Sequence, residues 1–365
     1  MIRRFLPVLG GALLTLSGCA GASTATSGVT TGLNGKSIPA IKLPPYVPGP
    51  LDGYSTPRQQ ALRRPLGIIL ENYAPDSRPQ SGLGAASTVI ETLAEGGVTR
   101  FLALYLERDA AKVGPVRSTR VYFNDWAAGF HAILGHVGGN DDAQAALWHL
   151  PKVFNLDENR WEVNLYNTGT PLFWRSANRV APHNLYTSTY KLREYATQHG
   201  QDWTYGGASF LHKNPALLRA RGHAGSLSLT FENPLYPQVN PDYDVRYVYD
   251  RASDTYVRYM GGAPHIDANT GKTLAPANVV VMQTGAAAFD PRAGITPQSI
   301  TIPVIGRGVA WYFRDGGVQR GAWQQVNQNA PLQFFDRKGH GIALNPGQTW
   351  IEVVPASSQA TWSFH

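Results

Sequence analysis

The sequence predicts a mixed α+β fold, in which an N-terminal α/β region with a mixed sheet is followed by a β-rich C-terminal region. In the first half, short apolar runs typical of strands alternate with segments of helical periodicity. Beyond about residue 226, β-rich runs are separated by Gly, Asn, Asp and Pro, with little sign of long helices. With 365 residues, of which 43% are hydrophobic, the chain can bury one or two substantial cores.

The elements of the first half follow from this spacing. Residues 74–83 contain two prolines and a glycine, which predict an irregular segment between the first two strands. The second and third strands flank Gly96-Gly97 and are predicted to pair as a hairpin, which would make the sheet mixed. The expected elements are strands 66–70, 89–93 and 99–106, helix 118–130, strand 132–137, helix 142–150 and a helix from about 188 to 198.

In the second half, β-rich runs are separated by strong turn signals. Arg314-Asp315-Gly316-Gly317 and Asn345-Pro346-Gly347 are typical of tight turns. The change in pattern predicts a boundary between an α/β region, 51–215, and a β-rich region, 216–365. The expected strands of this half are 227–231, 245–249, 255–259, 279–282, 309–313 and 349–354.

The N-terminus has the pattern of a bacterial lipoprotein signal. Arg3 and Arg4 precede an apolar run, 5–16, which ends at Leu16-Ser17-Gly18-Cys19. A leucine, two small residues and a cysteine form a lipobox, so residues 1–18 are predicted to be cleaved and Cys19 to carry a diacylglyceryl lipid. The alternative is an ordinary cleaved signal peptide with an incidental cysteine. Cys19 is the only cysteine, so no intramolecular disulfide is available.

A flexible tether is predicted for residues 19–50. This stretch is rich in Gly, Ser, Thr, Ala and Pro, and its only charges are Lys36 and Lys42. A chain of this composition reaches roughly 30 Å, which is enough to hold a folded body clear of the lipid head groups. The expected location is therefore extracytoplasmic, with the lipid on Cys19 anchoring the protein to a bacterial membrane.

Charge and motif content narrow the classes of function. The formal net charge is +7, but the basic residues are scattered, so no nucleic-acid partner is expected. No P-loop, G-x-G-x-x-G or G-x-S-x-G pattern is present, and the histidines form no metal-ligand grouping. Neither a cofactor nor a metal is expected. Ser188-Thr189-Tyr190-Lys191 fits S-x-x-K, but its usual companion motifs are missing, so Ser188 is interpreted as a helix cap.

Five motifs are distributed along the chain: Arg78-Pro79-Gln80-Ser81-Gly82-Leu83, Glu95-Gly96-Gly97-Val98-Thr99-Arg100-Phe101, Gly114-Pro115-Val116-Arg117-Ser118, Ala181-Pro182-His183-Asn184-Leu185-Tyr186 and Asn345-Pro346-Gly347-Gln348-Thr349-Trp350. Together they resemble the YerB-type lipoproteins, a bacterial family of unknown function with a two-part body. The resemblance covers about residues 64–355 and implies a membrane-tethered envelope protein, without any catalytic assignment. One departure is Ser87-Thr88, where an acidic residue commonly precedes the hydrophobic strand.

The most suggestive candidate site is the segment from Gly114 to Arg120. A Gly-Pro turn entering a helix leaves backbone N–H groups free at the helix N-terminus, and these groups attract anions. Arg117 and Arg120 would add forked donors for a phosphate or carboxylate, with Ser118 between them. In the alternative, Ser118 caps the helix and both arginines pair with acids such as Glu91 or Glu95.

Other candidate residues lie at loops and strand ends. His183 and Asn184 follow a proline on a loop, where an imidazole can act as a general base or donate to a ligand, or can simply lock the loop. His136 ends a strand beside Gly138-Gly139, at an edge where α/β proteins bind ligands. Glu95 and Arg100 complete the candidate ligand-binding set.

The sequence therefore predicts a lipid-anchored envelope protein that binds an anionic envelope ligand or a protein partner through its α/β region. The alternative is an extracytoplasmic enzyme acting on an anionic glycan or peptidoglycan fragment, with Arg117 and Arg120 as the anion clamp and His183 as acid or base. Whether the protein is an enzyme is left open. A solute-binding lipoprotein is disfavoured, because it would need two similar α/β lobes.

Overall fold

A computed structural model describes residues 44–160, 163, 171–207, 209–232, 235, 240–285, 288–289 and 299–364. Residues Pro45–His365 form one compact unit. The predicted signal peptide, Cys19 and most of the tether lie outside the described residues. Among the described helices, none has the length and apolar character needed to cross a membrane.

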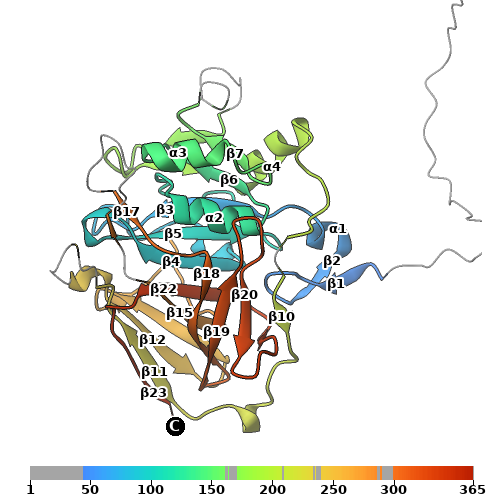
Figure 1. Cartoon of the computed structure of the whole chain (residues 1–365), viewed down its shortest axis with the longest axis vertical. Helices are drawn as coiled ribbons and strands as arrows, with labels where there is room; N and C mark the ends of the chain where they lie inside the picture. The colour runs from blue at the N-terminus through green and yellow to red at the C-terminus, as the bar shows by residue number, and fades with distance from the viewer. Residues whose placement is uncertain are drawn as a thin grey trace, which may run out of the picture. The chain divides into compact units, whose positions relative to one another are not determined.

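The core of the protein is a mixed sheet of ten strands, which draws half of its strands from each half of the chain (Figure 1). Its order is β20-β19-β18-β15-β22-β4-β5-β3-β6-β7. The N-terminal strands are β3 (Leu66–Glu71), β4 (Thr88–Leu93), β5 (Thr99–Tyr105), β6 (Ile133–His136) and β7 (Phe154–Asp157). The C-terminal strands are β15 (Asn278–Thr284), β18 (Gly306–Arg314), β19 (Gly317–Gln325), β20 (Gln333–Asp336) and β22 (Thr349–Pro355).

The two halves join where β22 pairs with β4 in parallel, with Trp350 opposite Val89 and Glu352 opposite Glu91. Every residue of β3, β4, β5 and β22 is buried. Both faces of these central strands are covered, which explains why their sequences are nearly continuous apolar runs rather than alternating ones.

A second, antiparallel sheet of five strands is built from the C-terminal half alone. Its order is β14-β13-β12-β11-β23, and side chains of β12 and β13 reach residues of β4 and β22 in the large sheet. Along β13, buried and half-buried residues alternate, as expected for a sheet with one face against a core. The strands are β11 (Gly225–Leu229), β12 (Val245–Asp250), β13 (Thr255–Met260), β14 (Ala263–Pro264) and β23 (Ala360–Phe364).

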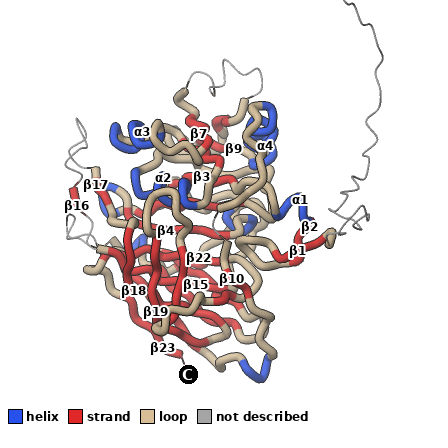
Figure 2. Tube along the Cα trace, turned by 45° about the vertical axis from the view of Figure 1, so that its right-hand side comes forward, coloured by secondary structure: helices blue, strands red, loops and turns tan. Residues whose placement is uncertain are grey.

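The longer described helices lie near β3 and β7, whereas the other part of the body consists mainly of strands and the loops that join them (Figure 2). The α-helices are α1 (Arg58–Ala61), α2 (Val121–Gly129), α3 (Asp141–Leu147) and α4 (Thr189–Gln198), and four 3-10 turns are η1 (Leu83–Ala85), η2 (Glu95–Gly97), η3 (Leu218–Ala220) and η4 (Pro241–Tyr243). Four small two-stranded sheets pair β1 (Tyr46–Pro48) with β2 (Ser55–Pro57), β8 (Phe173–Arg175) with β9 (Leu185–Thr187), β10 (Leu211–His212) with β21 (Ala343–Leu344) and β16 (Ala288–Phe289) with β17 (Ile300–Thr301).

The predicted fold class is confirmed, and the β4–β5 hairpin makes the sheet mixed as expected. Two details differ from the prediction. Residues 46–48 of the predicted tether form strand β1, and Leu51, three residues after that strand ends, is fully buried, so ordered structure begins before Pro50. Strands from both sides of the boundary predicted at 215/216 share one sheet, although that boundary itself stays a prediction.

Candidate functional site

The C-terminal edge of β3, β6 and β7 gathers most of the polar residues that the sequence singled out. These three strands are parallel, and they end at Glu71, His136 and Asp157 respectively. In open sheets of α/β proteins, ligands bind at this edge.

Glu71 is the centre of the first cluster at this edge. Its carboxylate is 5% exposed and lies 3.1 Å from Nε of Arg117 and 3.0 Å from Nδ1 of His183. The ring of His183 stacks on Tyr73 with ring centroids 5.2 Å apart, and its Nε2 atom lies 4.0 Å from Asp76. The structure thus brings two of the predicted residues, Arg117 and His183, onto one carboxylate that the sequence analysis had not selected.

Glu95 is the centre of a second cluster. Arg120 donates to both of its carboxylate oxygens, at 2.6 and 2.5 Å, and Arg100 lies 3.8 Å away. Burial alone would raise the pKa of Glu95, but the hydrogen bonds and charge of Arg120, with the charge of Arg100, outweigh it and lower that pKa. Arg100 also donates to the backbone carbonyl of Ser118. The predicted pairing of Arg120 with Glu95 is therefore present.

The predicted helix N-terminus at Ser118 is wrong. Helix α2 begins at Val121, and the preceding residues are extended. The backbone N–H of Arg117 donates to Ile69, and that of Thr119 donates to Gly138. Because the segment after Pro115 is bonded along β3, these N–H groups are already used and cannot form an anion-binding helix end. Ser118 caps no helix.

His136 and Asn184 are held inside the structure. His136 is fully buried, with Nδ1 2.8 Å from the carbonyl of Gly138 and Nε2 2.7 Å from Oδ1 of Asn155. Asn184 accepts from Arg175 and donates to the carbonyl of Ser176. The polar atoms of both side chains thus have protein partners, as a role in locking loops requires. Within the described residues, no group of three or more His, Cys, Asp or Glu could hold a metal ion.

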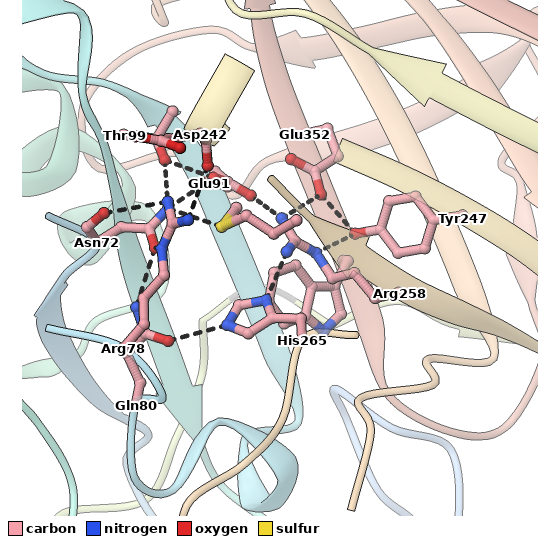
Figure 3. Close-up of polar contacts among 12 residues, drawn as sticks. Asn72, Arg78, Gln80, Glu91, Thr99, Asp242, Tyr247, Arg258, His265 and Glu352 are labelled. Carbon is pink, nitrogen blue, oxygen red and sulfur yellow. Dashed lines mark hydrogen bonds and ion pairs between the residues drawn. The ribbon is translucent and has the colours of Figure 1, made fainter. Parts of the chain in front are cut away.

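A third polar cluster, which sequence reasoning missed, lies where the two sheets meet (Figure 3). Glu91 of β4 and Glu352 of β22 are directly opposite each other, and Arg258 of β13 bonds to Glu91 and lies 3.5 Å from Glu352. All three side chains are 0% exposed. Tyr247 of β12 donates to Glu352 and accepts from Arg258.

The same arginine is tied to the loop between β3 and β4 through a chain of neutral groups. Arg258 lies 2.5 Å from Nδ1 of His265, whose Nε2 lies 2.9 Å from Oε1 of Gln80. Because an arginine can only donate, Nδ1 accepts and the proton of His265 is on Nε2. Gln80 then donates to Asn72, which donates to Thr99. The closed ring of hydrogen bonds runs Arg258–His265–Gln80–Asn72–Thr99–Glu91–Arg258.

The protonation states in this cluster follow from burial. Burial raises the pKa of Glu91 well above its usual value and Glu352 raises it further, although the charge of Arg258 opposes both. Burial and the charge of Arg258 lower the pKa of His265 well below its usual value, so the imidazole is neutral. The buried cluster thus contains one guanidinium and two carboxyls, and burial of Glu91 favours its protonated form.

The signal that could have revealed this cluster is an acid inside an apolar strand. Glu91 and Glu352 each occupy a run of otherwise uncharged, buried residues, where a carboxylate needs a partner. The partner could not be found from the sequence, because Arg258 is 167 residues away from Glu91.

Comparisons with known proteins agree with this architecture. Models of one family match the chain twice, as "Protein of unknown function (DUF3048) N-terminal domain" at residues 51–202 and as its C-terminal domain at residues 236–351. The chain is 31% identical over 315 residues to "Putative lipoprotein YerB" of Bacillus subtilis (strain 168), covering 86% of this chain and 88% of that protein. A solved structure, "Crystal structure of YerB protein from Bacillus subtilis", matches with a TM-score of 0.72 and 29% identity, covering 86% of this chain and 99% of that one. The resemblance expected from the sequence motifs is therefore confirmed, and the chain belongs to the YerB-type, DUF3048 family of proteins of unknown function.

Proposed function

We propose that this protein is a lipoprotein anchored on the extracytoplasmic side of a bacterial membrane, and that its α/β region binds an anionic ligand of the cell envelope at Arg117. The lipobox at Leu16-Ser17-Gly18-Cys19 supports the anchor, as does the word lipoprotein in the name of the Bacillus subtilis relative. The ligand class follows from the charges at the C-terminal sheet edge.

The observation that carries the binding proposal is the state of the Arg117 guanidinium. Its Nε faces Glu71, 28% of its side chain is exposed, and within the described part of the chain its two Nη atoms have no protein partner. Arg100 and Arg120, in contrast, are directed at Glu95 and at backbone carbonyls. A guanidinium oriented through Nε and open at both Nη atoms presents a fork that matches a phosphate or carboxylate.

Arg117 is the accessible cation at this edge. The two clusters contain three arginines, at 100, 117 and 120, and the carboxylates of Glu71 and Glu95, with the exposed Asp76 beside His183. Arg100 and Arg120 are buried beside Glu95, so Arg117 is the arginine that an anion can reach. His183, 16% exposed, adds a hydrogen-bonding imidazole beside it.

The test is the substitution Arg117→Ala in the soluble body starting at Pro44, titrated with inorganic phosphate and with carboxylate-bearing muropeptides by calorimetry. Loss of a charged hydrogen bond should weaken binding by about 1.5–3 kcal/mol while the variant stays folded. Arg179→Ala is the matched control, because Arg179 is half-buried and both of its Nη atoms already donate, to the backbone carbonyls of Asp76 and Pro79. This control should bind as the parent does.

The alternative role of Arg117, as a structural partner of Glu71, predicts a different result for the same substitution. If Arg117 serves only to neutralise Glu71, Arg117→Ala should cost about 3–5 kcal/mol of stability, because an unpaired buried carboxylate remains. Adding Glu71→Gln should then restore stability. A stability loss of this kind, without any change in ligand binding, would contradict the proposal.

A catalytic role at the same edge is the second candidate, and the His183–Glu71 hydrogen bond is the observation that favours it. A carboxylate 3.0 Å from Nδ1 orients the ring and leaves Nε2 toward Asp76 and solvent, as a general base requires. The reaction would be cleavage of an anionic glycan or peptidoglycan fragment. His183→Gln that removed turnover of muropeptides but kept their binding would favour the enzyme over the binding protein.

A further inference from the structure

A cavity of about 530 Å³ lies between the loop that follows β3 and the turn that joins β13 to β14. Pro75 and Pro79 of the loop form one wall, and Met260, Pro264 and Ile266 form the other. The loop lies in the part of the chain matched by the N-terminal family model, and the turn lies in the part matched by the C-terminal model. The cavity therefore opens between the two halves, with mostly apolar walls and a volume in the range of small-molecule sites.

Arg78 is the cation at this cavity. Its Nε donates to Oδ1 of Asn72 at 2.8 Å, Nη1 to the backbone carbonyl of Asp242 at 2.7 Å, and Nη2 to the backbone carbonyl of Asn72 at 3.3 Å (Figure 3). Its guanidinium also lies over the ring of Tyr243, 5.0 Å from the centroid. Every acceptor is neutral. Within the described residues, no carboxylate lies within 4.0 Å of it, so a half-buried positive charge has no ion-pair partner.

The other ionisable groups at the cavity do not neutralise Arg78. His265 is neutral, and both of its ring nitrogens are used, by Gln80 and Arg258. Arg258 behind it is matched by Glu91 and Glu352. Asp242 lines the cavity, but it bonds to Arg78 through its backbone. Burial lowers the pKa of Arg78, and the charge of Arg258 acts in the same direction, whereas Glu91, Tyr243 and Asp242 oppose the shift from a distance without reversing it.

We propose that this cavity is a second ligand site, distinct from Arg117, that takes an amphipathic monoanion. The carboxylate or sulfonate of such a ligand pairs with Arg78, and its alkyl or aryl body packs against Met260, Pro264 and Ile266. An arginine has five N–H donors, and three of those of Arg78 are used by neutral acceptors, so two remain for the ligand. The anionic group of the ligand pairs with the charge of Arg78. The apolar walls favour an alkyl or aryl part, because its burial removes apolar surface from water.

The site can be tested with a matched pair of probes, octanoate and octan-1-ol, titrated into the soluble body by calorimetry. The parent should bind octanoate at least tenfold more tightly than octanol, because both share the chain and only octanoate carries the charge. Arg78→Gln should remove this preference and leave octanol binding unchanged. Ala263→Phe, which places a ring in the cavity and keeps Arg78, should weaken both probes.

Arg246→Gln is the charge-matched control, because Arg246 is exposed on the neighbouring strand β12 and does not line this cavity. It should bind octanoate as the parent does. The proposal is overturned if the parent binds neither probe saturably, if Arg78→Gln keeps the octanoate preference, or if Ala263→Phe binds both probes as the parent does. Thermal unfolding of each variant identifies any loss of fold, and Ala263→Phe remains informative if Arg78→Gln unfolds.

Discussion

Arg258 keeps its charge in a region from which water is excluded. Desolvation disfavours the charged guanidinium, but Tyr247, Glu91 and Glu352 outweigh it and raise the pKa of Arg258 above its usual value. The ion pair with Glu91 is compensated further by hydrogen bonds to His265 and Tyr247. A buried pair of this kind adds little net stability over apolar residues of the same shape, but removal of one member leaves an uncompensated group.

This asymmetry gives a prediction for the buried cluster. Arg258→Met should destabilise the protein by about 3–5 kcal/mol, because two carboxyls remain without a cation. The loss should be smaller at pH 5 than at pH 8. Burial raises the folded-state pKa of Glu91, so folding without the Arg258 charge favours its protonated form, and stability falls as the pH rises above the unfolded value. Chemical denaturation at both pH values measures this.

Glu91→Gln is the control for that prediction, because the amide keeps the size and most hydrogen-bonding capacity of a carboxyl that is already inclined to hold a proton. The loss of stability in Glu91→Gln should be clearly smaller than the loss in Arg258→Met. Equal losses for the two variants, independent of pH, would show that packing rather than charge determines the stability of this region.

At the residue scale, the sequence predicted local pairs better than distant ones. Arg120 and Glu95 are 25 residues apart on neighbouring elements, and their pairing was one of the stated alternatives. His183 was expected on a loop near Arg117, but Glu71, which joins them, was not foreseen, since its strand is otherwise apolar. Arg258 could not be assigned to Glu91, because the pairing depends on how two sheets pack.

At the element scale, the positions of strands could be predicted, but their order could not. Apolar runs located β3, β4, β5 and β22 within a few residues, because burial of both faces leaves a clear pattern. The placement of β22 between β15 and β4 depends on parallel pairing across distant segments, which no local pattern encodes. The start of α2 was misplaced because residues before Val121 bond to β3 and to Gly138 instead of entering the helix.

The beginning of the folded body gives a prediction at the same scale. A chain shortened to begin at Pro44 should unfold at the same temperature as the mature chain. A chain that begins at Leu51 lacks β1 and therefore the three residue pairs that β1 forms with β2. It also lacks two backbone hydrogen bonds, from Gly49 to Tyr54 and from Arg58 to Pro45. It should lose about 1–2 kcal/mol, the net value of one or two hydrogen bonds. Differential scanning calorimetry of the two chains measures this difference, and equal unfolding temperatures would show that β1 contributes nothing to stability.

At the scale of the whole molecule, the two family-defined parts are structurally interdependent. Residues 51–202 supply five strands of the large sheet, and residues 236–351 supply most of the other five, joined by β22 against β4. Arg258 connects the second sheet to the same junction. The change of pattern near residue 216 marks a change in the kind of structure, while the sheet continues across both parts.

The anchor gives the prediction for the whole protein. If Cys19 carries the lipid, Cys19→Ser should abolish labelling with a fatty-acid probe and move the protein from the membrane fraction to the soluble one. Acyl chains contribute about 0.8 kcal/mol for each buried CH₂, so they supply nearly all of the membrane affinity. Ser17→Ala keeps a small residue in the lipobox and should be labelled like the parent. An unlabelled parent, together with unchanged membrane association of Cys19→Ser, would mean that the cysteine is incidental and that the envelope-ligand site is held at the membrane by other contacts.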